Sequence, residues 1–273
     1  IKSFMSVSWR DEKEKSLKKL IEKNRIGLVT DMDGTISHIV RKPEDAIVTP
    51  HSLELLAALR TKLALVAVVS GRPAQNVRER VGLSGVEYIG NHGLERWVDG
   101  EVRHNAALKA YLPRLEASVA KLRQISIVGS QVEDKGVTVT IHYRQTENPE
   151  QTQKQLRPLV QQIASDEGLD FFEGRMIFEL RPPVKADKGI AFAELVQEFD
   201  LDGAIYIGDD TTDLSALAMA RRLREDETCY ALGVGVLSDD HPAALPETAD
   251  LLAAGVDDVE KFLTWFFENL RRS

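Results

Sequence analysis

Two aspartates separated by one residue, Asp31 and Asp33, follow an apolar stretch in the segment RIGLVTDMDGT, residues 25–35. Two carboxylates about 4 Å apart repel each other by roughly 4 kcal/mol at an effective dielectric constant near 20. A divalent cation relieves that repulsion, and Mg²⁺ prefers such hard oxygen ligands. Taken alone, the segment also fits an Asx turn that ends a strand. It does not fit an EF-hand, because the glycine of an EF-hand loop comes sixth rather than fourth.

A second acidic segment, GDDTTD at residues 208–213, adds three carboxylates after another apolar run. An aspartate or a threonine of this segment could cap the helix that begins near its end, but a cap formed by Thr211 or Thr212 leaves Asp209 and Asp210 unexplained. Carboxylates that meet at one edge of a sheet repel each other, which destabilises the fold unless a cation binds between them. We therefore predict a magnesium site formed by Asp31, Asp33, Asp209, Asp210 and Asp213.

Two further segments contain groups suited to binding a phosphate. Ser70 in VSGRP follows an apolar run, and Pro73 is suited to the first turn of a helix whose N–H groups can bind an anion. Lys188 in KADKG precedes another helical stretch. Taken alone, these segments also fit an ordinary helix start and a solvated lysine. Beside an acidic metal site, a lysine can balance the carboxylates and hold a phosphoryl group.

These residue types predict phosphoryl transfer through an aspartate. A carboxylate with an ordinary pKa of about 3.9 is ionised at neutral pH, so Asp31 can attack phosphorus without a base. Asp33 can then protonate the leaving oxygen and later deprotonate the water that hydrolyses the aspartyl-phosphate. A bound Mg²⁺ spreads the charge that develops on the phosphoryl group.

The elements that must position these groups are predicted from hydrophobic patterning. Residues 26–30, 63–69 and 204–208 are apolar runs, each followed by small or acidic residues and then a helical stretch, and residues 229–234 form a fourth run. Such continuous runs are typical of strands buried on both faces of a parallel sheet. Strands that alternate with helices indicate an α/β fold with a doubly wound parallel sheet, which binds ligands at the carboxyl ends of its strands.

The middle of the chain has a different pattern. A helix, a hairpin, a second helix and a second hairpin are predicted there. GVTVTIHYR is expected to be a half-exposed alternating strand, and the second hairpin to turn at Glu173–Gly174. We interpret residues 107–182 as an inserted α+β cap domain, and residues 1–106 with 183–273 as the catalytic core.

The bulk composition narrows the class of protein. The 273 residues suffice for two domains, and a formal net charge of −8 argues against a nucleic-acid binder. The charged N-terminal segment is unlike a signal peptide, and the longest apolar run is far shorter than the ~20 residues that span a bilayer. The single cysteine, Cys229, cannot form an internal disulfide. We expect a cytoplasmic protein that binds neither nucleic acid nor membrane; its oligomeric state is open, and a monomer is compatible with the sequence.

The segments DMDGT, SGR, KADKG and GDDTTD, in this order, resemble the four motifs of the haloacid dehalogenase-like phosphatases over the whole chain. The resemblance implies a Rossmann-like core with a type II cap between the second and third motifs. The implied roles are Asp31 as nucleophile, Asp33 as acid/base, Ser70 and Lys188 as phosphate-binding groups, and Asp209, assisted by Asp210 or Asp213, as the main magnesium ligand. Asp33 would also bind the metal through its carbonyl.

Within that superfamily, the chain is similar to the trehalose-phosphate phosphatases. GDDTTD has their spacing, GNHGLE resembles their third-strand segment, and VEDKGVTVTIHYR and GRMIFELRP resemble their substrate-reading strands. Such strands would offer paired donors and acceptors to a polyol; the alternative is that the cap charges merely cover an exposed face. The substrate contacts implied by the resemblance are Gly34, Thr35, Gly71, Arg72, Asn91 and His92 in the core and Glu133, Lys135, Arg144 and Glu179 in the cap, with His142 as a further candidate.

The resemblance implies a magnesium-dependent phosphatase that converts trehalose 6-phosphate to trehalose and phosphate. The alternatives are a phosphatase for a sugar phosphate of the sucrose or mannosylglycerate type, a phosphosugar mutase, and a sugar-phosphate sensor without turnover. A sensor is disfavoured because both Asp31 and Asp33 are retained. One departure from the family puts the sugar in question: an acidic pair and an aromatic residue usually follow the fourth motif, where this chain has Leu214, Ser215 and Leu217.

Overall fold

The computed structural model describes residues 7–40, 42–174 and 176–270. The chain divides into two compact units, one formed by the residues up to Arg103 and from Ala186 onward, the other by His104–Lys185. The second unit therefore starts at residue 104 rather than 107 and ends at 185 rather than 182. The substrate-reading role assigned to it from the sequence stays a prediction.

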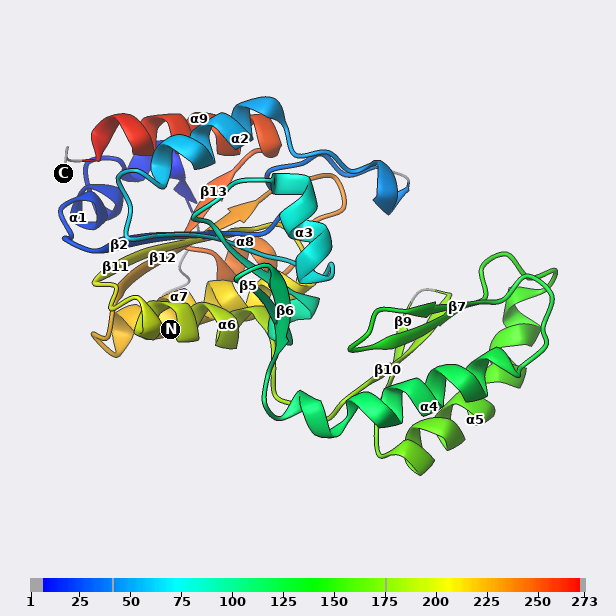
Figure 1. Cartoon of the computed structure of the whole chain (residues 1–273). Helices are drawn as coiled ribbons and strands as arrows, with labels where there is room; N and C mark the ends of the chain where they lie inside the picture. Colours follow the sequence, from blue (N-terminus) through cyan, green and yellow to red (C-terminus); the bar gives the residue numbers. More distant parts are fainter. Residues whose placement is uncertain (1–6, 41, 175, 271–273) are drawn as a thin grey trace. The chain divides into compact units, whose positions relative to one another are not determined.

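The first unit is built on a sheet whose strand order among the described residues is β1-β13-β12-β11-β2-β3-β4-β5-β6 (Figure 1). All neighbours from β1 to β4 are parallel, and β5 is antiparallel to β4. In sheet order, the strands are Val7–Ser8 (β1), Leu251–Ala253 (β13), Tyr230–Val236 (β12), Gly203–Gly208 (β11), Ile26–Thr30 (β2), Leu65–Val69 (β3), Glu87–Gly90 (β4), Glu95–Val98 (β5) and Glu101–His104 (β6).

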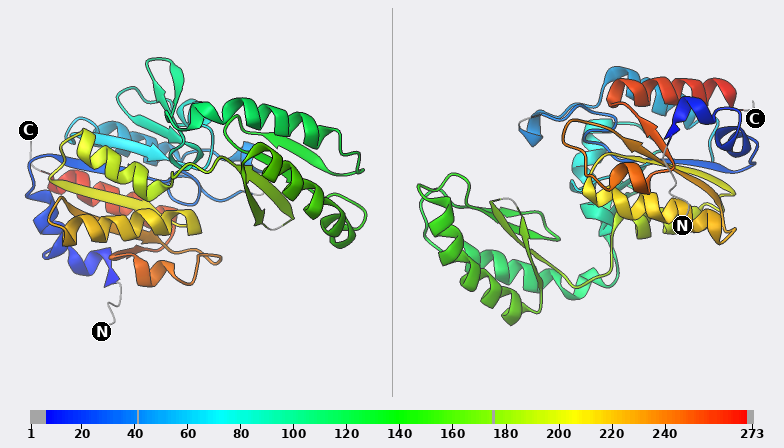
Figure 2. Two further views of the ribbon diagram at one scale, coloured as in Figure 1. Left: turned by 90° about the horizontal axis from the view of Figure 1, so that it is seen from below. Right: turned by 180° about the vertical axis from the view of Figure 1, so that it is seen from behind.

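Helices cover both faces of this sheet (Figures 1 and 2). One layer contains α1 (Ser16–Ile21), α2 (Pro50–Leu59), α3 (Ala74–Val81) and α9 (Val256–Asn269), and the other contains α6 (Lys188–Glu198), α7 (Leu214–Glu225) and α8 (Leu245–Thr248). Short 3₁₀ helices comprise Trp9–Glu12 (η1), Pro43–Asp45 (η2), Asn91–Gly93 (η3), Leu108–Ala110 (η4) and Thr211–Asp213 (η5). The predicted doubly wound α/β fold is confirmed.

The central strands explain the continuous apolar runs of the sequence. Every residue of β2, β3 and β11 is buried, because helices pack on both faces of the sheet. Three of the four predicted motifs, DMDGT, SGR and GDDTTD, begin where these strands end, at the carboxyl edge, whereas KADKG leads into α6. The backbone N–H of Asp31 donates to the carbonyl of Ile207 at 2.8 Å, so the hydrogen bonding of the sheet continues to the first aspartate.

The second unit contains a four-stranded antiparallel sheet in the order β7-β8-β10-β9, with two helices along one face (Figure 2). Its elements are α4 (Leu112–Arg123), β7 (Gln131–Asp134), β8 (Val139–His142), α5 (Pro149–Glu167), β9 (Asp170–Gly174) and β10 (Ile177–Arg181). The predicted order of helix, hairpin, helix and hairpin is confirmed. No helix among the described residues is both long and apolar enough to cross a membrane.

Two expectations for the second unit were wrong. The strand β8 is not half-exposed: Val139, Thr140 and Ile141 are all buried, because β8 lies between β7 and β10. The second hairpin does not turn at Glu173–Gly174, since both residues belong to β9 and Gly174 pairs with Ile177. This register is consistent with apolar packing, because the ring centroids of Phe171 and Phe178 lie 5.3 Å apart.

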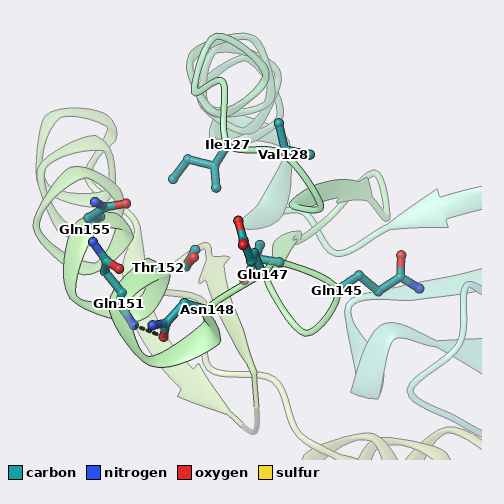
Figure 3. A pocket seen from close by; sticks show the side chains of 9 residues that line it. Ile127, Val128, Gln145, Glu147, Asn148, Gln151, Thr152 and Gln155 are labelled. Carbon is teal, nitrogen blue, oxygen red and sulfur yellow. Dashed lines mark hydrogen bonds between the residues drawn. The ribbon is translucent and has the colours of Figure 1, made fainter.

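A polar pocket of about 470 Å³ lies at the N-terminal end of α5 (Figure 3). Its walls contain mostly carboxamide and hydroxyl groups: Ile127, Val128, Gln145, Thr146, Glu147, Asn148, Gln151, Thr152 and Gln155. The side chain of Asn148 caps the helix by accepting the backbone N–H of Gln151 at 3.1 Å. None of the site residues predicted from the sequence lines this pocket.

Candidate active site

The predicted catalytic groups lie at the carboxyl ends of adjacent strands of the first unit. Asp31 follows β2, Ser70 follows β3, Asn91 follows β4 and Asp209 follows β11. Lys188 is the first residue of α6. Doubly wound sheets bind their ligands at this edge, so the fold places all five groups where a substrate is expected.

Lys188 is buried between two carboxylates. Its Nζ atom lies 3.1 Å from Oδ1 of Asp31 and 2.8 Å from Oδ1 of Asp213, and the whole residue is 1% exposed. Burial alone would lower the pKa of the ammonium group, but the surrounding carboxylates outweigh it and raise the pKa above the usual lysine value. The site therefore contains a permanent positive charge beside Asp31.

Asp213 is held by four hydrogen bonds. Its Oδ1 atom accepts from Lys188 Nζ at 2.8 Å and from the Tyr206 hydroxyl at 2.6 Å. Its Oδ2 atom accepts from the backbone N–H groups of Asp209 and Asp210, at 3.0 Å each. Tyr206 was not predicted from the sequence, because an aromatic residue in an apolar strand normally belongs to the hydrophobic core.

Three of the five predicted acids come together. Carboxylate oxygens of Asp31, Asp209 and Asp213 lie within 4.8 Å of one another. Burial raises the pKa of Asp31 well above its usual range, and burial together with Asp213 and Asp210 raises the pKa of Asp209 to about 7. The raised pKa values mean that these carboxylates repel each other when ionised, and a bound cation would relieve that repulsion. Because Mg²⁺ prefers hard oxygen ligands, the group fits a magnesium site.

The turn after Asp33 is shaped around Asp209. Gly34 has a φ of +79°, and a Cβ atom at this position would overlap the Asp209 carboxylate. The hydroxyl of Thr35, which is fully buried, donates to Oδ1 of Asp209 at 3.4 Å. A glycine is therefore required here both for the left-handed backbone and for the close approach of the acid.

The Asp33 carboxylate is not one of the three clustered acids and pairs with Arg72. Two parallel bonds, from Nε to Oδ2 at 2.6 Å and from Nη2 to Oδ1 at 2.8 Å, hold it in a bidentate arrangement. The backbone N–H of Arg72 also donates to the hydroxyl of Ser70 at 3.2 Å. Arg72, predicted to contact the substrate, thus positions the predicted acid/base.

The ends of β3 and β4 are joined through left-handed residues. Asn91 and His92 have φ values of 47° and 59°, and their N–H groups donate to the carbonyls of Arg72 and Ser70 at 2.8 and 3.0 Å. A Cβ atom on Gly71 would lie 2.6 Å from the His92 ring. The buried Asn91 Nδ2 makes no hydrogen bond within the described part of the chain, so it is a donor available to a ligand.

An aspartate, Asp210, caps the helical segment at the end of the acidic motif, which is one of the two possibilities left open by the sequence. Its Oδ1 atom accepts from the N–H groups of Thr212 at 2.7 Å and Asp213 at 3.1 Å. These bonds and the charge of Lys188 lower the pKa of Asp210 despite its burial. The cap explains Asp210 structurally, because aspartate is among the best N-cap residues.

The predicted sugar-binding residues belong to the sheet of the second unit. Glu133 on β7 lies 2.8 Å from Nε2 of His142 and 4.0 Å from Nζ of Lys135. Glu179 on β10 is buried and accepts from Nε of Arg181 at 2.7 Å. Arg144 is exposed in the turn after β8, and its contact with the substrate stays a prediction.

A profile of the trehalose-phosphatase family matches residues 29–239. The chain belongs to the trehalose-phosphatase family. It is 33% identical over 238 residues to the trehalose-phosphate phosphatase of Mycobacterium marinum, covering 82% of this chain and 60% of that protein. It is 36% identical over 215 residues to an uncharacterized glycosyl hydrolase of Mycobacterium tuberculosis, covering 75% of this chain and 16% of that protein. The chain thus spans less than two thirds of the length of either relative.

Solved structures of this family have the same fold. The C-terminal domain of a Candida albicans trehalose-6-phosphate phosphatase superposes with a TM-score of 0.72 at 19% identity, covering 98% of this chain and 99% of that one. A trehalose-6-phosphate phosphatase related protein gives a TM-score of 0.70 at 23% identity, covering 89% of this chain and 97% of that one.

Leu214, Ser215 and Leu217, interpreted from the sequence as departures from the family pattern, pack α7 against its neighbours. The Ser215 hydroxyl accepts the N–H of Gly189 in α6 at 3.1 Å and donates to the carbonyl of Thr212 at 3.1 Å. Leu217 is fully buried in the core beside α6, and Leu214 packs partly buried against the same core. These three residues therefore have a structural role in this family member.

Proposed function

We propose that this chain is a phosphatase that hydrolyses a sugar phosphate through an aspartyl-phosphate on Asp31. The observation that carries the proposal is the buried Lys188 ammonium, 3.1 Å from Asp31 and 2.8 Å from Asp213, beside Asp209. The positive charge of Lys188 opposes the rise in the pKa of Asp31 that burial causes, so it favours the ionised, nucleophilic form, and it stabilises negative charge on a phosphoryl group. The charge lies at the ligand-binding edge of the sheet.

The residues of the acidic group fit a magnesium ion. Asp31 and Asp209 would hold it, together with the main-chain carbonyl of Asp33. Asp213 would act through its hydrogen bonds, because both of its oxygens already accept two donors. When bound, the ion supplies positive charge that offsets the phosphoryl oxygens.

The protein groups can divide the reaction into two steps. In the first, an oxygen of Asp31 attacks phosphorus, the bond from phosphorus to the sugar oxygen breaks, and protonated Asp33 gives its proton to that oxygen. In the second, Asp33 takes a proton from the water that attacks phosphorus, and the bond to Asp31 breaks. Arg72 orients Asp33, and Ser70 and Asn91 offer donors to the phosphate.

Trehalose 6-phosphate is the first candidate substrate. Support comes from the family match and from the Mycobacterium marinum relative, which is named a trehalose-phosphate phosphatase. Because the chain covers only part of such relatives, another sugar phosphate is the second candidate. Phosphate release from a panel of sugar phosphates, with and without Mg²⁺, tests both. Phosphate moved within the sugar would indicate a mutase, and binding without turnover would indicate a sensor.

Glu133→Ala and Glu179→Ala are expected to reduce kcat/KM for the best sugar phosphate about tenfold or more, because each removes a charged hydrogen-bond partner of the sugar. Hydrolysis of a small aryl phosphate should change less than about twofold. Steady-state kinetics on both substrates give the answer. Equal losses on the two substrates would mean that these carboxylates support the fold instead.

The stabilisation of the protein by Mg²⁺ is expected to increase between pH 5.5 and pH 8. The pKa of Asp209, raised to about 7 in the metal-free site, means that the folded state retains a proton that the unfolded state has already lost. The metal-free protein therefore loses stability as pH rises towards about 7, by up to ~1.4 kcal/mol per pH unit for one group, and this loss is complete above that pH. Bound Mg²⁺ offsets that loss.

Thermal unfolding with and without Mg²⁺ at the two pH values measures this difference. Asp209→Asn is the control, because it removes the titrating ligand and should abolish both the magnesium effect and its pH dependence. A magnesium-induced shift in the unfolding midpoint of equal size at both pH values would contradict the assignment of Asp209.

A further inference from the structure

The sheet of the second unit contains two buried threonine hydroxyls without a hydrogen-bond partner. Thr138 is 5% exposed and Thr140 is fully buried. Neither Oγ1 atom makes a hydrogen bond within the described part of the chain. A buried hydroxyl left unpaired destabilises a fold, and the β-branched residue valine would fill the same space without this penalty. A function that uses these two hydroxyls would explain why threonine rather than valine occupies both positions.

The register of the sheet places these hydroxyls among the predicted sugar-binding residues. Thr140 on β8 lies directly opposite Glu133 on β7 and Glu179 on β10. Residues opposite each other in antiparallel strands present their side chains to the same face. Thr138 is two residues away and shares that face, and its carbonyl accepts the N–H of Lys135 at 3.1 Å.

The charges on this face nearly balance. Glu133 is paired with His142 and Lys135, and Glu179 with Arg181. A face without excess charge of either sign offers no advantage to a metal ion or to a phosphate. Its alternating donors and acceptors instead match the hydroxyl groups of a neutral polyol.

An exposed aromatic ring completes the row. Phe172 on β9 lies opposite Glu179 and is 42% exposed. The guanidinium of Arg181 lies 4.4 Å from the centroid of the Phe172 ring, and this cation–π contact holds the ring in its position. Apolar surface next to a few placed polar groups is the usual lining of a site for an organic ligand, and here it suits the C–H face of a sugar.

We propose that Thr138 and Thr140 determine specificity, their hydroxyls binding hydroxyl groups of the sugar. Glu133 and Glu179 would exchange their ion pairs for bonds to the same sugar and so uncover the two threonines. The inference rests on the proposed function, and it adds two residues that the sequence motifs did not indicate. It also explains why threonines occupy two buried positions, one in β8 and one immediately before it.

Thr138→Val and Thr140→Val test the proposal. Each variant is expected to raise KM for the best sugar phosphate about five- to tenfold, the usual effect of one lost hydrogen bond. The unfolding midpoint should stay the same or rise, and kcat/KM for a small aryl phosphate should stay within about twofold. If the hydroxyls only support the fold, the variants should instead lower the unfolding midpoint and leave KM for the sugar phosphate unchanged. Thr140→Ser keeps the hydroxyl, so its KM for the sugar phosphate should stay close to that of the wild type.

Thr152→Val is the matched control. Thr152 is a buried threonine of α5 that lines the pocket in Figure 3, on a different element of the same unit. Its replacement should leave the kinetics on both the sugar phosphate and the aryl phosphate unchanged. Unchanged sugar-phosphate kinetics in both the Thr138→Val and the Thr140→Val protein, or equal losses on the aryl phosphate, would overturn the proposal and leave the proposed function standing. Wild-type protein that cleaves the aryl phosphate but no sugar phosphate would overturn both.

Discussion

Asp31→Asn is expected to reduce phosphate release at least about a thousandfold, because an amide cannot form the phosphorylated intermediate. The fold should persist, since asparagine has the same shape and Lys188 keeps its bond to Asp213 at 2.8 Å. Release of phosphate from a sugar phosphate by purified protein measures the loss, and circular dichroism with thermal unfolding checks the fold.

Asp45→Asn is a suitable control for this experiment, because Asp45 is an exposed aspartate of the same unit. It should retain wild-type turnover. Residual activity of the Asp31→Asn protein within about tenfold of wild type would exclude Asp31 as the nucleophile.

Lys188→Met is expected to lower the free energy of unfolding by about 3–5 kcal/mol, and to abolish turnover as well. Without the ammonium group, the buried carboxylates of Asp31 and Asp213 lose the cation that offsets their desolvation. Protonation neutralises these acids, so the loss of stability should be smaller at pH 5.5 than at pH 8.

Chemical denaturation at both pH values measures this effect. Lys185→Met, three positions earlier at an exposed residue, should change stability by less than about 0.5 kcal/mol. A loss for Lys188→Met below about 1 kcal/mol at pH 8 would show that the lysine does not compensate the buried acids.

The central strands and the motifs that follow them could be predicted from the sequence. Strands such as β2 and β11 are buried on both faces, so their burial appears directly as continuous apolar runs. The acids come immediately after these runs, and the carboxyl ends of parallel strands meet at one edge. The last two strands of the sheet order, β5 and β6, were missed because they are short and mostly only partly buried.

The pairing of the polar groups could not be predicted, because it depends on contacts between segments far apart in the chain. The sequence places Asp33 two residues from Asp31, yet its carboxylate pairs with Arg72. Tyr206 contacts Asp213 only because the chain turns back after β11. The burial of Thr140 likewise depends on the two strands beside it.

The four hydrogen bonds to Asp213 have a consequence for the energetics of the reaction. Two of the donors are main-chain amides and the other two come from buried side chains, so the dipoles around the acidic group are already oriented before a phosphate arrives. Water in the same place would have to reorient as charge moves onto the phosphoryl oxygens. In the proposed reaction, the fixed Asp213 carboxylate would keep the ammonium group of Lys188 in place beside Asp31, so little reorganisation energy would be needed and the barrier would be lower without tighter binding of the substrate.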